Sequence, residues 1–306
     1  MKLDPDRMLD RRRLKRAITI WRVLAILAVA ALIIVAIGRF VGGGPAGGDH
    51  IARLWVTGLI YDYAGRGEAL AEIAEDDDIK AVILRINSPG GTMAGSEALY
   101  LGLREIAARK PLVAVMDTTA ASGGYLAALA AERIVARNST VTGSIGVILQ
   151  TADVTQMLEE LGVSTEAIKS APLKGAPSPF EPLDEASRAA SQAVVDDMYA
   201  LFVDILAERR GLEPSEARAL ADGRIFTGRQ AAAHGLIDEI GGEKEVRAWL
   251  KNNRGVSSTL RVYDLDLGER EDIVERLVSS VGESVLPRRL MLDGLLAVWH
   301  PGVGRE

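Results

Sequence analysis

The chain has 306 residues, of which 48% are hydrophobic and 25% are charged, and it contains no cysteine. This length and apolar content allow one large domain or two small ones, and the absence of cysteine excludes disulfides and a thiol nucleophile. The net charge is −6, but residues 1–22 hold eight basic and three acidic side chains, so this segment carries +5 and the remainder −11. A nucleic-acid-binding protein would concentrate positive charge on its folded part, so the charge distribution argues against that class.

The first predicted element is an apolar helix near the N-terminus. Residues 23–38 form a run of 16 residues without a charge, between Arg22 and Arg39. As a helix the run would be about 24 Å long, against a hydrocarbon core of roughly 30 Å, and the flanking arginines can reach the interface. Because most basic residues precede the run, the positive-inside rule predicts a cytoplasmic N-terminus and an exported remainder. The alternative is a cleaved signal peptide with its cleavage site at Ala36–Gly38.

The remaining elements alternate between strands and helices. Strands are predicted at residues 51–60, 80–86, 112–116, 133–136 and 164–168, and helices at 68–75, 93–110, 123–131, 152–161, 183–210 and 231–234. This alternation predicts an α/β fold with a parallel sheet covered by helices, and ligand sites at the carboxyl ends of its strands. The expected organisation is a basic cytoplasmic segment (1–22), a transmembrane anchor (23–40), a glycine-rich linker (41–49), a catalytic domain (50–250) and a C-terminal extension (251–306).

The chain is organised around a serine between a predicted strand and a predicted helix. Ser122 lies in the small-residue stretch Thr118–Tyr125. A strand that ends in a small-residue turn and restarts as a helix presents a hydroxyl beside helix N–H groups, and a developing oxyanion needs such donors. The alternative is that Ser122 simply caps the helix, because serine is a preferred N-cap residue.

Three further stretches favour a catalytic site. Asn87–Gly91 follows the predicted strand 80–86, and its Pro-Gly-Gly sequence suits a backbone that approaches a ligand closely, although an ordinary turn is the alternative. The other two stretches are Thr142–Val147 and the proline-rich loop 168–179, which carries Lys169 and Lys174. In isolation, each lysine would be expected to be a solvated surface charge.

No metal or cofactor site is predicted. The three histidines are His50, His234 and His300. They are far apart in the sequence and outside the strand-turn-helix stretches. A Ser-His-Asp triad and a histidine-based metal site are therefore not expected.

Together these stretches resemble the signal peptide peptidase A family, in its short, single-unit, membrane-anchored bacterial form. Five motifs occur in the family's order, namely Asn87–Gly91, Ala121–Tyr125, Thr142–Val147, Ile168–Ser170 with Lys174, and Asp222–Gln230. They span roughly residues 51–250. The resemblance implies the parallel-sheet superhelical α/β fold that the Clp protease subunit and the crotonases share.

The resemblance also implies a serine endopeptidase with a Ser-Lys dyad and no cofactor. Ser122 would be the nucleophile, Lys174 the general base, and Ser144 the serine that orients the lysine. The backbone N–H groups of Gly91 and Gly123 would form the oxyanion hole. A free lysine has a pKa near 10.4, so in general a lysine base must be buried to accept a proton near neutral pH. Lys169 does not match the family's base.

The biological setting is likewise implied by the resemblance. The protein would degrade cleaved signal peptides and other hydrophobic peptides at the bacterial cytoplasmic (inner) membrane. It would cross that membrane once, with its N-terminus in the cytoplasm and its catalytic domain on the periplasmic or extracellular side. A homo-oligomeric ring with active sites shared between subunits is expected, with no nucleic-acid partner. Two alternatives are a crotonase-like acyl-CoA enzyme, which would need neither the anchor nor the dyad, and a catalytically inactive membrane scaffold.

Overall fold

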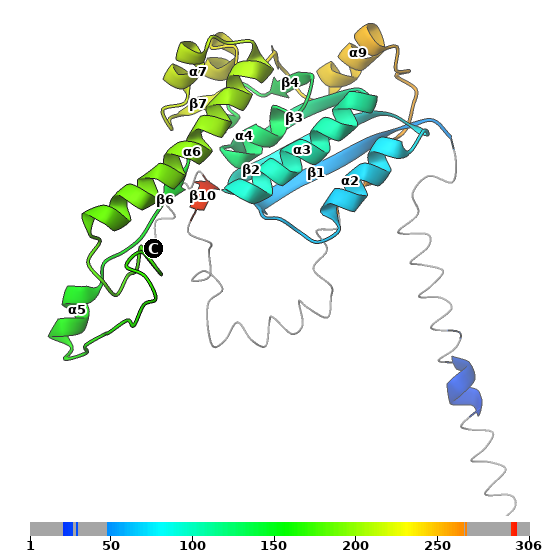
Figure 1. The fold of residues 1–306 in the computed structure, drawn as a ribbon. Coiled ribbons are helices and arrows are strands. Elements are labelled where there is room, and N and C mark those ends of the chain that lie inside the picture. The colour runs from blue at the N-terminus through cyan, green and yellow to red at the C-terminus, as the bar shows by residue number, and fades with distance from the viewer. Residues whose placement is uncertain (1–20, 27–28, 30–47, 266, 268–294, 299–306) are drawn as a thin grey trace, which may run out of the picture. The chain divides into compact units, whose positions relative to one another are not determined.

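A computed structural model describes residues 21–26, 29, 48–265, 267 and 295–298 (Figure 1). The chain divides into two units, Met1–Gly48 and Asp49–Glu306, and the second holds the sheet. In the first unit, residues 21–26 are helical, while most of the predicted anchor 23–40 lies outside the described residues. Among the residues that the structure describes, no helix is both long enough and apolar enough to cross a membrane.

The second unit is built on a ten-stranded sheet that is mostly parallel. Its centre consists of β1 (His50–Ile60), β2 (Ile79–Thr92), β3 (Leu112–Ala121) and β4 (Arg133–Ala136), which pair in that order and all in parallel. Further parallel strands are β5 (Val141–Gly143) beside β3, β8 (Glu239–Ile240) beside β4 and β9 (Val262–Leu265) beside β1. The mixed α/β fold with a largely parallel sheet is therefore confirmed.

Three pairings are antiparallel, which the sequence did not predict. The strand β7 (Ile225–Thr227) runs antiparallel to β5. The strand β10 (Leu295–Val298) runs antiparallel to both β2 and β6 (Ile148–Leu149), and lies between them. These short strands occupy the edges around the carboxyl ends of β2 and β3.

Helices cover both faces of the sheet. On one face the core includes residues of α2 (Arg66–Glu75), α3 (Met93–Arg109), α4 (Gly123–Ala128), α6 (Glu185–Arg210), α7 (Pro214–Leu220) and α8 (Gly228–Ala233). On the other face, α9 (Glu243–Arg254) buries Val246 and Leu250. In β2, Leu84 packs into the first core and Ile83 into the second. A strand that is buried on both faces is apolar throughout, which is why the central strands are recognisable in the sequence.

Several predicted boundaries were wrong at the ends of the central strands. The stretch Asn87–Gly91, predicted as a loop, belongs to β2 and pairs with β1, with Gly91 opposite Ile60. Residues 118–121, predicted as a turn, are the last residues of β3. The helical start at α4 does follow directly at Gly123. Pro-Gly-Gly therefore serves here as an irregular strand whose register shifts along β1, and not as a connection between elements.

The prediction of a strand at 164–168 was wrong, because this segment has no pairing partner, and Ile168 is 98% exposed. It belongs to residues 148–184, here called the arm, which include β6 and the short helix α5 (Thr155–Glu160). None of residues 146–186 is buried. Figure 1 shows the arm and the N-terminal half of α6 projecting away from the sheet.

Candidate functional site

Ser122 occupies a strained turn between β3 and α4. Its backbone has φ 53° and ψ −119°, a conformation that costs a residue with a Cβ about 1–3 kcal/mol. Ser122 stands at the N-cap position of α4 but its side chain makes no capping hydrogen bond. Its Oγ is buried and has no hydrogen-bond partner among the described residues. The structure therefore gives no support to the simple capping interpretation and leaves the hydroxyl available for chemistry.

The strand β5 holds this turn from the side. The Ser122 N–H donates to the Gly143 carbonyl at 2.8 Å, and Gly143 itself has φ 79°. The next residue, Ser144, also has a positive φ, 48°, and its N–H donates to the Arg224 carbonyl at 2.8 Å. Two of the motifs, Thr142–Val147 and Asp222–Gln230, thus meet beside the serine. Because Gly143 bonds to Ser122, the structure places Ser144 in the neighbourhood of Ser122.

Gly91 and Gly123 lie against each other. A Cβ placed on Gly123 would be 3.3 Å from the Gly91 nitrogen and 2.1 Å from Ser96 Oγ. A Cβ on Gly91 would be 1.8 Å from the carbonyl oxygen of Ile60. At Gly91 a side chain would require movement of the Ile60 backbone, and at Gly123 it would require movement of the Ser96 side chain. The two N–H groups predicted for an oxyanion hole are therefore close to each other, and Gly123 directly follows Ser122.

Hydrogen bonds from motif side chains fix the carboxyl end of β2. Ser88 is buried, donates to the Gly58 carbonyl at 2.6 Å and accepts from the Gly90 N–H at 3.1 Å. Asn87 Oδ1 accepts from the Thr119 N–H at 3.2 Å, which ties β2 to β3. These bonds explain why Asn-Ser precedes Pro-Gly-Gly. The two polar side chains hold a backbone that two glycines would otherwise leave loose.

Tyr125 anchors the other side of the turn. Its ring is fully buried in α4, and its hydroxyl donates to the Leu236 carbonyl at 2.7 Å. Burial raises the pKa of this phenol well above its ordinary value. Tyr125 therefore stays neutral and structural, and it fixes the first turn of the helix that starts beside Ser122.

The two lysines of the arm do not join this cluster within one chain. Lys174 is exposed, and its ammonium makes no hydrogen bond to Ser122, whose Oγ has no partner among the described residues. Lys169 forms an ion pair with Glu181. The structure thus gathers Ser122, Ser144 and the two glycines, but it does not bond Lys174 to them.

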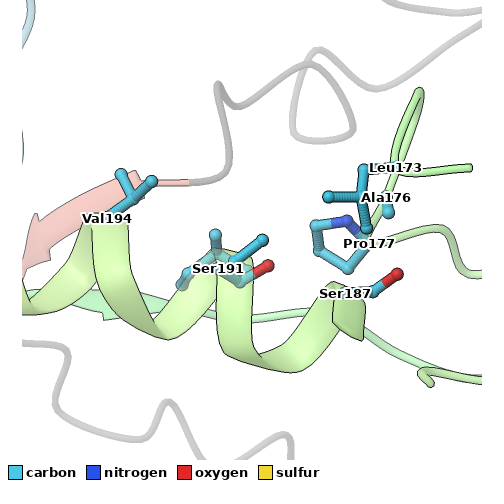
Figure 2. A pocket seen from close by; sticks show the side chains of 8 residues that line it. Leu173, Ala176, Pro177, Ser187, Ser191 and Val194 are labelled. Carbon is cyan, nitrogen blue, oxygen red and sulfur yellow. The ribbon is translucent and has the colours of Figure 1, made fainter. Parts of the chain in front are cut away.

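An apolar pocket lies beside the Lys174 loop. It has a volume of about 210 Å³. Figure 2 shows Leu173, Ala176 and Pro177 on the loop side and Ser187, Ser191 and Val194 on α6. Leu149 of β6 also lines the pocket. The pocket is therefore suited to an aliphatic group.

The histidines have structural surroundings. His50 is the first residue of β1 and lies about 30 Å from Ile60, the last residue of the strand. Its ring packs edge-on against Tyr263. His234 packs against Phe226, with ring centroids 5.4 Å apart. His300 lies outside the described residues. Across residues 48–265 and the other described positions, no group of three or more histidine, aspartate or glutamate side chains could hold a metal ion.

Sequence reasoning missed a charged pair that joins β2 to β3. Arg85 in β2 donates from Nε to Asp117 in β3 at 3.0 Å, and both side chains are largely buried. Glu243 of α9 also accepts from Arg85, at 3.0 Å. The only sequence signal is a charged residue inside the apolar part of each strand, at Arg85 in β2 and at Asp117 in β3. Their partnership depends on the register between β2 and β3, which places Arg85 opposite Val115.

Comparisons with known proteins identify the family of this chain. Residues 104–257, which include Ser122, Ser144 and Lys174, match the model of peptidase family S49. A candidate protease of Synechocystis sp. is 38% identical over 246 residues, which cover 80% of this chain and 87% of that protein. A candidate signal peptide peptidase SppA of Enterococcus faecium is 36% identical over 223 residues, 68% of this chain and 65% of that protein. The chloroplastic serine protease SPPA of Arabidopsis thaliana is 34% identical over 232 residues, 75% of this chain and 34% of that protein.

Proposed function

This chain belongs to peptidase family S49, the signal peptide peptidase A family, and from this premise we propose that it is a serine endopeptidase with Ser122 and Lys174 as a catalytic dyad. The observation that carries the proposal is the buried, unpartnered hydroxyl of Ser122, in a strained turn. Gly91 and Gly123 lie together at the same turn, so two N–H donors are available where the oxyanion would develop.

The proposed reaction is acyl transfer to the serine followed by hydrolysis. Neutral Lys174 takes the proton of the Ser122 hydroxyl as Oγ attacks the carbonyl carbon of the peptide bond. The Gly91 and Gly123 N–H groups stabilise the oxyanion. The C–N bond then breaks, the lysine gives its proton to the leaving amine, and an acyl-enzyme remains. Lys174 then takes a proton from a water molecule as the water oxygen attacks the acyl carbon. The ester bond to Oγ breaks, and the lysine returns the proton to Ser122. Ser144 is proposed to orient the lysine.

We further propose that Lys174 acts on Ser122 of a neighbouring subunit. The exposed position of Lys174 and the missing bond to Ser122 within one chain support this. The arm also exposes large apolar side chains, such as Met157, Leu161 and Phe180, which are 55%, 70% and 52% exposed. An interface between subunits would cover such groups. A head-to-tail contact that repeats around an axis closes into a ring, so a homo-oligomeric ring with shared sites is proposed.

Single substitutions test the dyad. Ser122→Ala and Lys174→Ala should each abolish cleavage of a small apolar peptide ester, while the matched control Lys169→Ala should retain it. Labelling by a serine-directed fluorophosphonate should be lost in Ser122→Ala, fall steeply in Lys174→Ala because the serine then lacks its base, and persist in Lys169→Ala. If only Lys169→Ala loses activity, the general base is Lys169 and the assignment of Lys174 is wrong. A folded wild-type protein that neither reacts with the probe nor cleaves the ester would instead be a scaffold.

Mixed oligomers test the sharing of sites. Inactive Ser122→Ala and Lys174→Ala subunits, refolded together, should regain a fraction of wild-type activity, because some interfaces would join an intact serine to an intact lysine. Each variant refolded alone is the control. Mixed oligomers that form but remain inactive would mean that each subunit carries its own complete site.

The proposed location is the outer side of the cytoplasmic membrane, with residues 23–40 as a retained anchor and hydrophobic peptides, including signal peptide remnants, as substrates. The charge asymmetry around residue 23 and the name of the Enterococcus relative support this. A reporter enzyme that is active only outside the cytoplasm should be active when it is fused after Gly48. A reporter that is active only in the cytoplasm should be inactive at the same position. Activity of the second reporter alone would refute the orientation.

A further inference from the structure

A buried serine outside the sequence motifs lies against the two glycines of the candidate oxyanion hole. Ser96 belongs to α3 and is fully buried. None of the five motifs contains it, and the proposed reaction does not use it. The helices α3 and α4 pack against each other on the same face of the sheet (Figure 1), which brings Ser96 next to the start of α4. A side chain in this place can act on the geometry of the site.

The oxygen of Ser96 touches Gly123. A Cβ placed on Gly123 would be 2.1 Å from Ser96 Oγ and 3.0 Å from Ser96 Cβ. Since a carbon–carbon bond is about 1.5 Å long, Ser96 Oγ is in van der Waals contact with the Gly123 backbone. The same point lies 3.3 Å from the Gly91 nitrogen. One side-chain oxygen is therefore close to both residues whose N–H groups are proposed to bind the oxyanion.

The hydroxyl also holds the residue that follows Gly91. Ser96 donates to the Thr92 carbonyl at 2.9 Å. Thr92 is the N-cap of α3, and its Oγ1 accepts from the Gly95 N–H at 3.1 Å. A bond from a serine to the carbonyl four residues earlier is common in helices and alone would be a local feature. Here the same oxygen joins the Gly91 side of the hole, through Thr92, to the Gly123 side by direct contact.

A buried cation fixes the first turn of α3. Arg66 is 2% exposed and donates to the Gly95 carbonyl at 2.9 Å and to the Tyr61 carbonyl. A Cβ on Gly95 would be 2.7 Å from the carbonyl carbon of Tyr61, so this turn has no room to move toward the end of β1. The turn is therefore a rigid support, and the Ser96 side chain decides how far the start of α4 stands from it.

Resting on the proposed function, we propose that Ser96 is a positioning residue that sets the spacing between the Gly91 and Gly123 N–H groups, so that both reach one oxyanion. Such a donor acts on the transition state when it is about 3 Å from the place where the negative charge develops. A displacement of about 1 Å in an active site can lower the rate about 100-fold. Loss of the Ser96 oxygen should therefore weaken the tetrahedral state and leave the binding of the intact substrate unchanged.

A pair of inhibitors separates these two states. A peptide aldehyde adds to the serine: Ser122 Oγ bonds to the aldehyde carbon, the hydroxyl proton passes to Lys174, and the aldehyde oxygen becomes the anion in the hole. The peptide alcohol of the same sequence binds without a covalent bond. In Ser96→Ala, the affinity for the aldehyde and the kcat for an apolar fluorogenic peptide amide should fall about 10–100-fold. The affinity for the alcohol and KM should stay within about twofold of wild type.

Thr140→Val is the matched control. It also removes a buried hydroxyl, which donates to the main-chain carbonyl of Asp117 at 2.6 Å and lies outside the glycine pair. Both variants should lower Tm, because each loses a buried hydrogen bond. Thr140→Val should leave the ratio of aldehyde to alcohol affinity unchanged. If Ser96→Ala also keeps this ratio, or loses both affinities equally, Ser96 is only structural and the inference is overturned.

The contact between positions 96 and 123 can also be tested without catalysis. Ser96→Gly should destabilise the wild-type protein but stabilise Gly123→Ala, because it makes room for the new methyl group. Purely additive effects in unfolding experiments would mean that the two residues do not touch, and would overturn the spacing role. If wild-type protein neither cleaves peptides nor reacts with the fluorophosphonate, the proposed function fails, and this coupling still decides whether Ser96 sets the distance between α3 and α4.

Discussion

The backbone conformation of Ser122 leads to a stability prediction of unusual sign. Replacing a residue by glycine normally destabilises a protein, relative to alanine, by roughly 0.5–1 kcal/mol, because glycine has more freedom in the unfolded chain. Ser122, however, has φ 53°, where a Cβ costs on the order of 1–3 kcal/mol. We therefore expect Ser122→Gly to be more stable than Ser122→Ala. Both variants lack the hydroxyl, so their difference isolates the backbone.

The magnitude follows from these two opposing contributions. The relief of strain, less the entropic cost of glycine, leaves Ser122→Gly ahead of Ser122→Ala by about 1 kcal/mol. For a folded unit of this size that difference corresponds to roughly 2–4 °C in Tm. Calorimetry or urea unfolding at one protein concentration measures it, since assembly makes stability dependent on concentration. Both variants should be catalytically inactive.

The neighbouring residue supplies the control. Ala121 is fully buried at the end of β3 and does not have a positive φ. Ala121→Gly should therefore destabilise the protein, by about 1–2 kcal/mol, through the lost methyl group and the added backbone freedom. If Ser122→Gly is less stable than Ser122→Ala by a similar margin, Ser122 is not strained, and the argument that this turn is held for catalysis loses its support.

Three further predictions concern the surroundings of the site. Gly123→Ala should cost about 1–3 kcal/mol of stability, because the new methyl group would meet the Ser96 hydroxyl at 2.1 Å. Adding Ser96→Gly should recover part of this loss, and unfolding of the single and double variants measures the coupling. Tyr125→Phe should cost about 1–3 kcal/mol, because it leaves a buried carbonyl without its donor, and should lower Tm without changing the pH profile of activity. The backbone N–H of Ser187 lowers the pKa of Asp184, so this carboxylate stabilises the folded state above its unfolded pKa of about 3.9 and loses that effect as the pH falls through the lower folded value. The stability difference between wild type and Asp184→Asn should therefore shrink below about pH 4 in unfolding experiments.

The central strands could be predicted from the sequence because both faces of the sheet are buried. The apolar runs at 80–86 and 112–116 stand out for that reason. The ends of these strands could not be predicted, because Pro-Gly-Gly is ordinarily a loop signal. At Gly91 the glycine instead permits the close approach of Ile60, a contact between distant parts of the chain. The helix α9 was missed since only Val246 and Leu250 of its twelve residues are buried.

The candidate site was predictable to the extent that its parts are local. The serine, its following glycine and the motif around Ser144 lie at element boundaries, and small residues mark such positions. The bond between Arg85 and Asp117 was not predictable, because strand register is decided by packing of the whole sheet. If the sites are shared, the position of Lys174 relative to the serine on which it acts depends on the contact between subunits. It could then not be predicted from the fold of one chain.

The lack of any buried residue from 146 to 186 has a consequence for when the enzyme works. A segment without a core of its own has little local stability and opens at low free-energy cost. If this segment delivers the base only when another subunit supports it, a lone subunit is inert. Specific activity would then fall on dilution, as the subunits separate. A newly made chain would be harmless to its surroundings until enough copies had gathered to assemble, with no propeptide required to keep it silent.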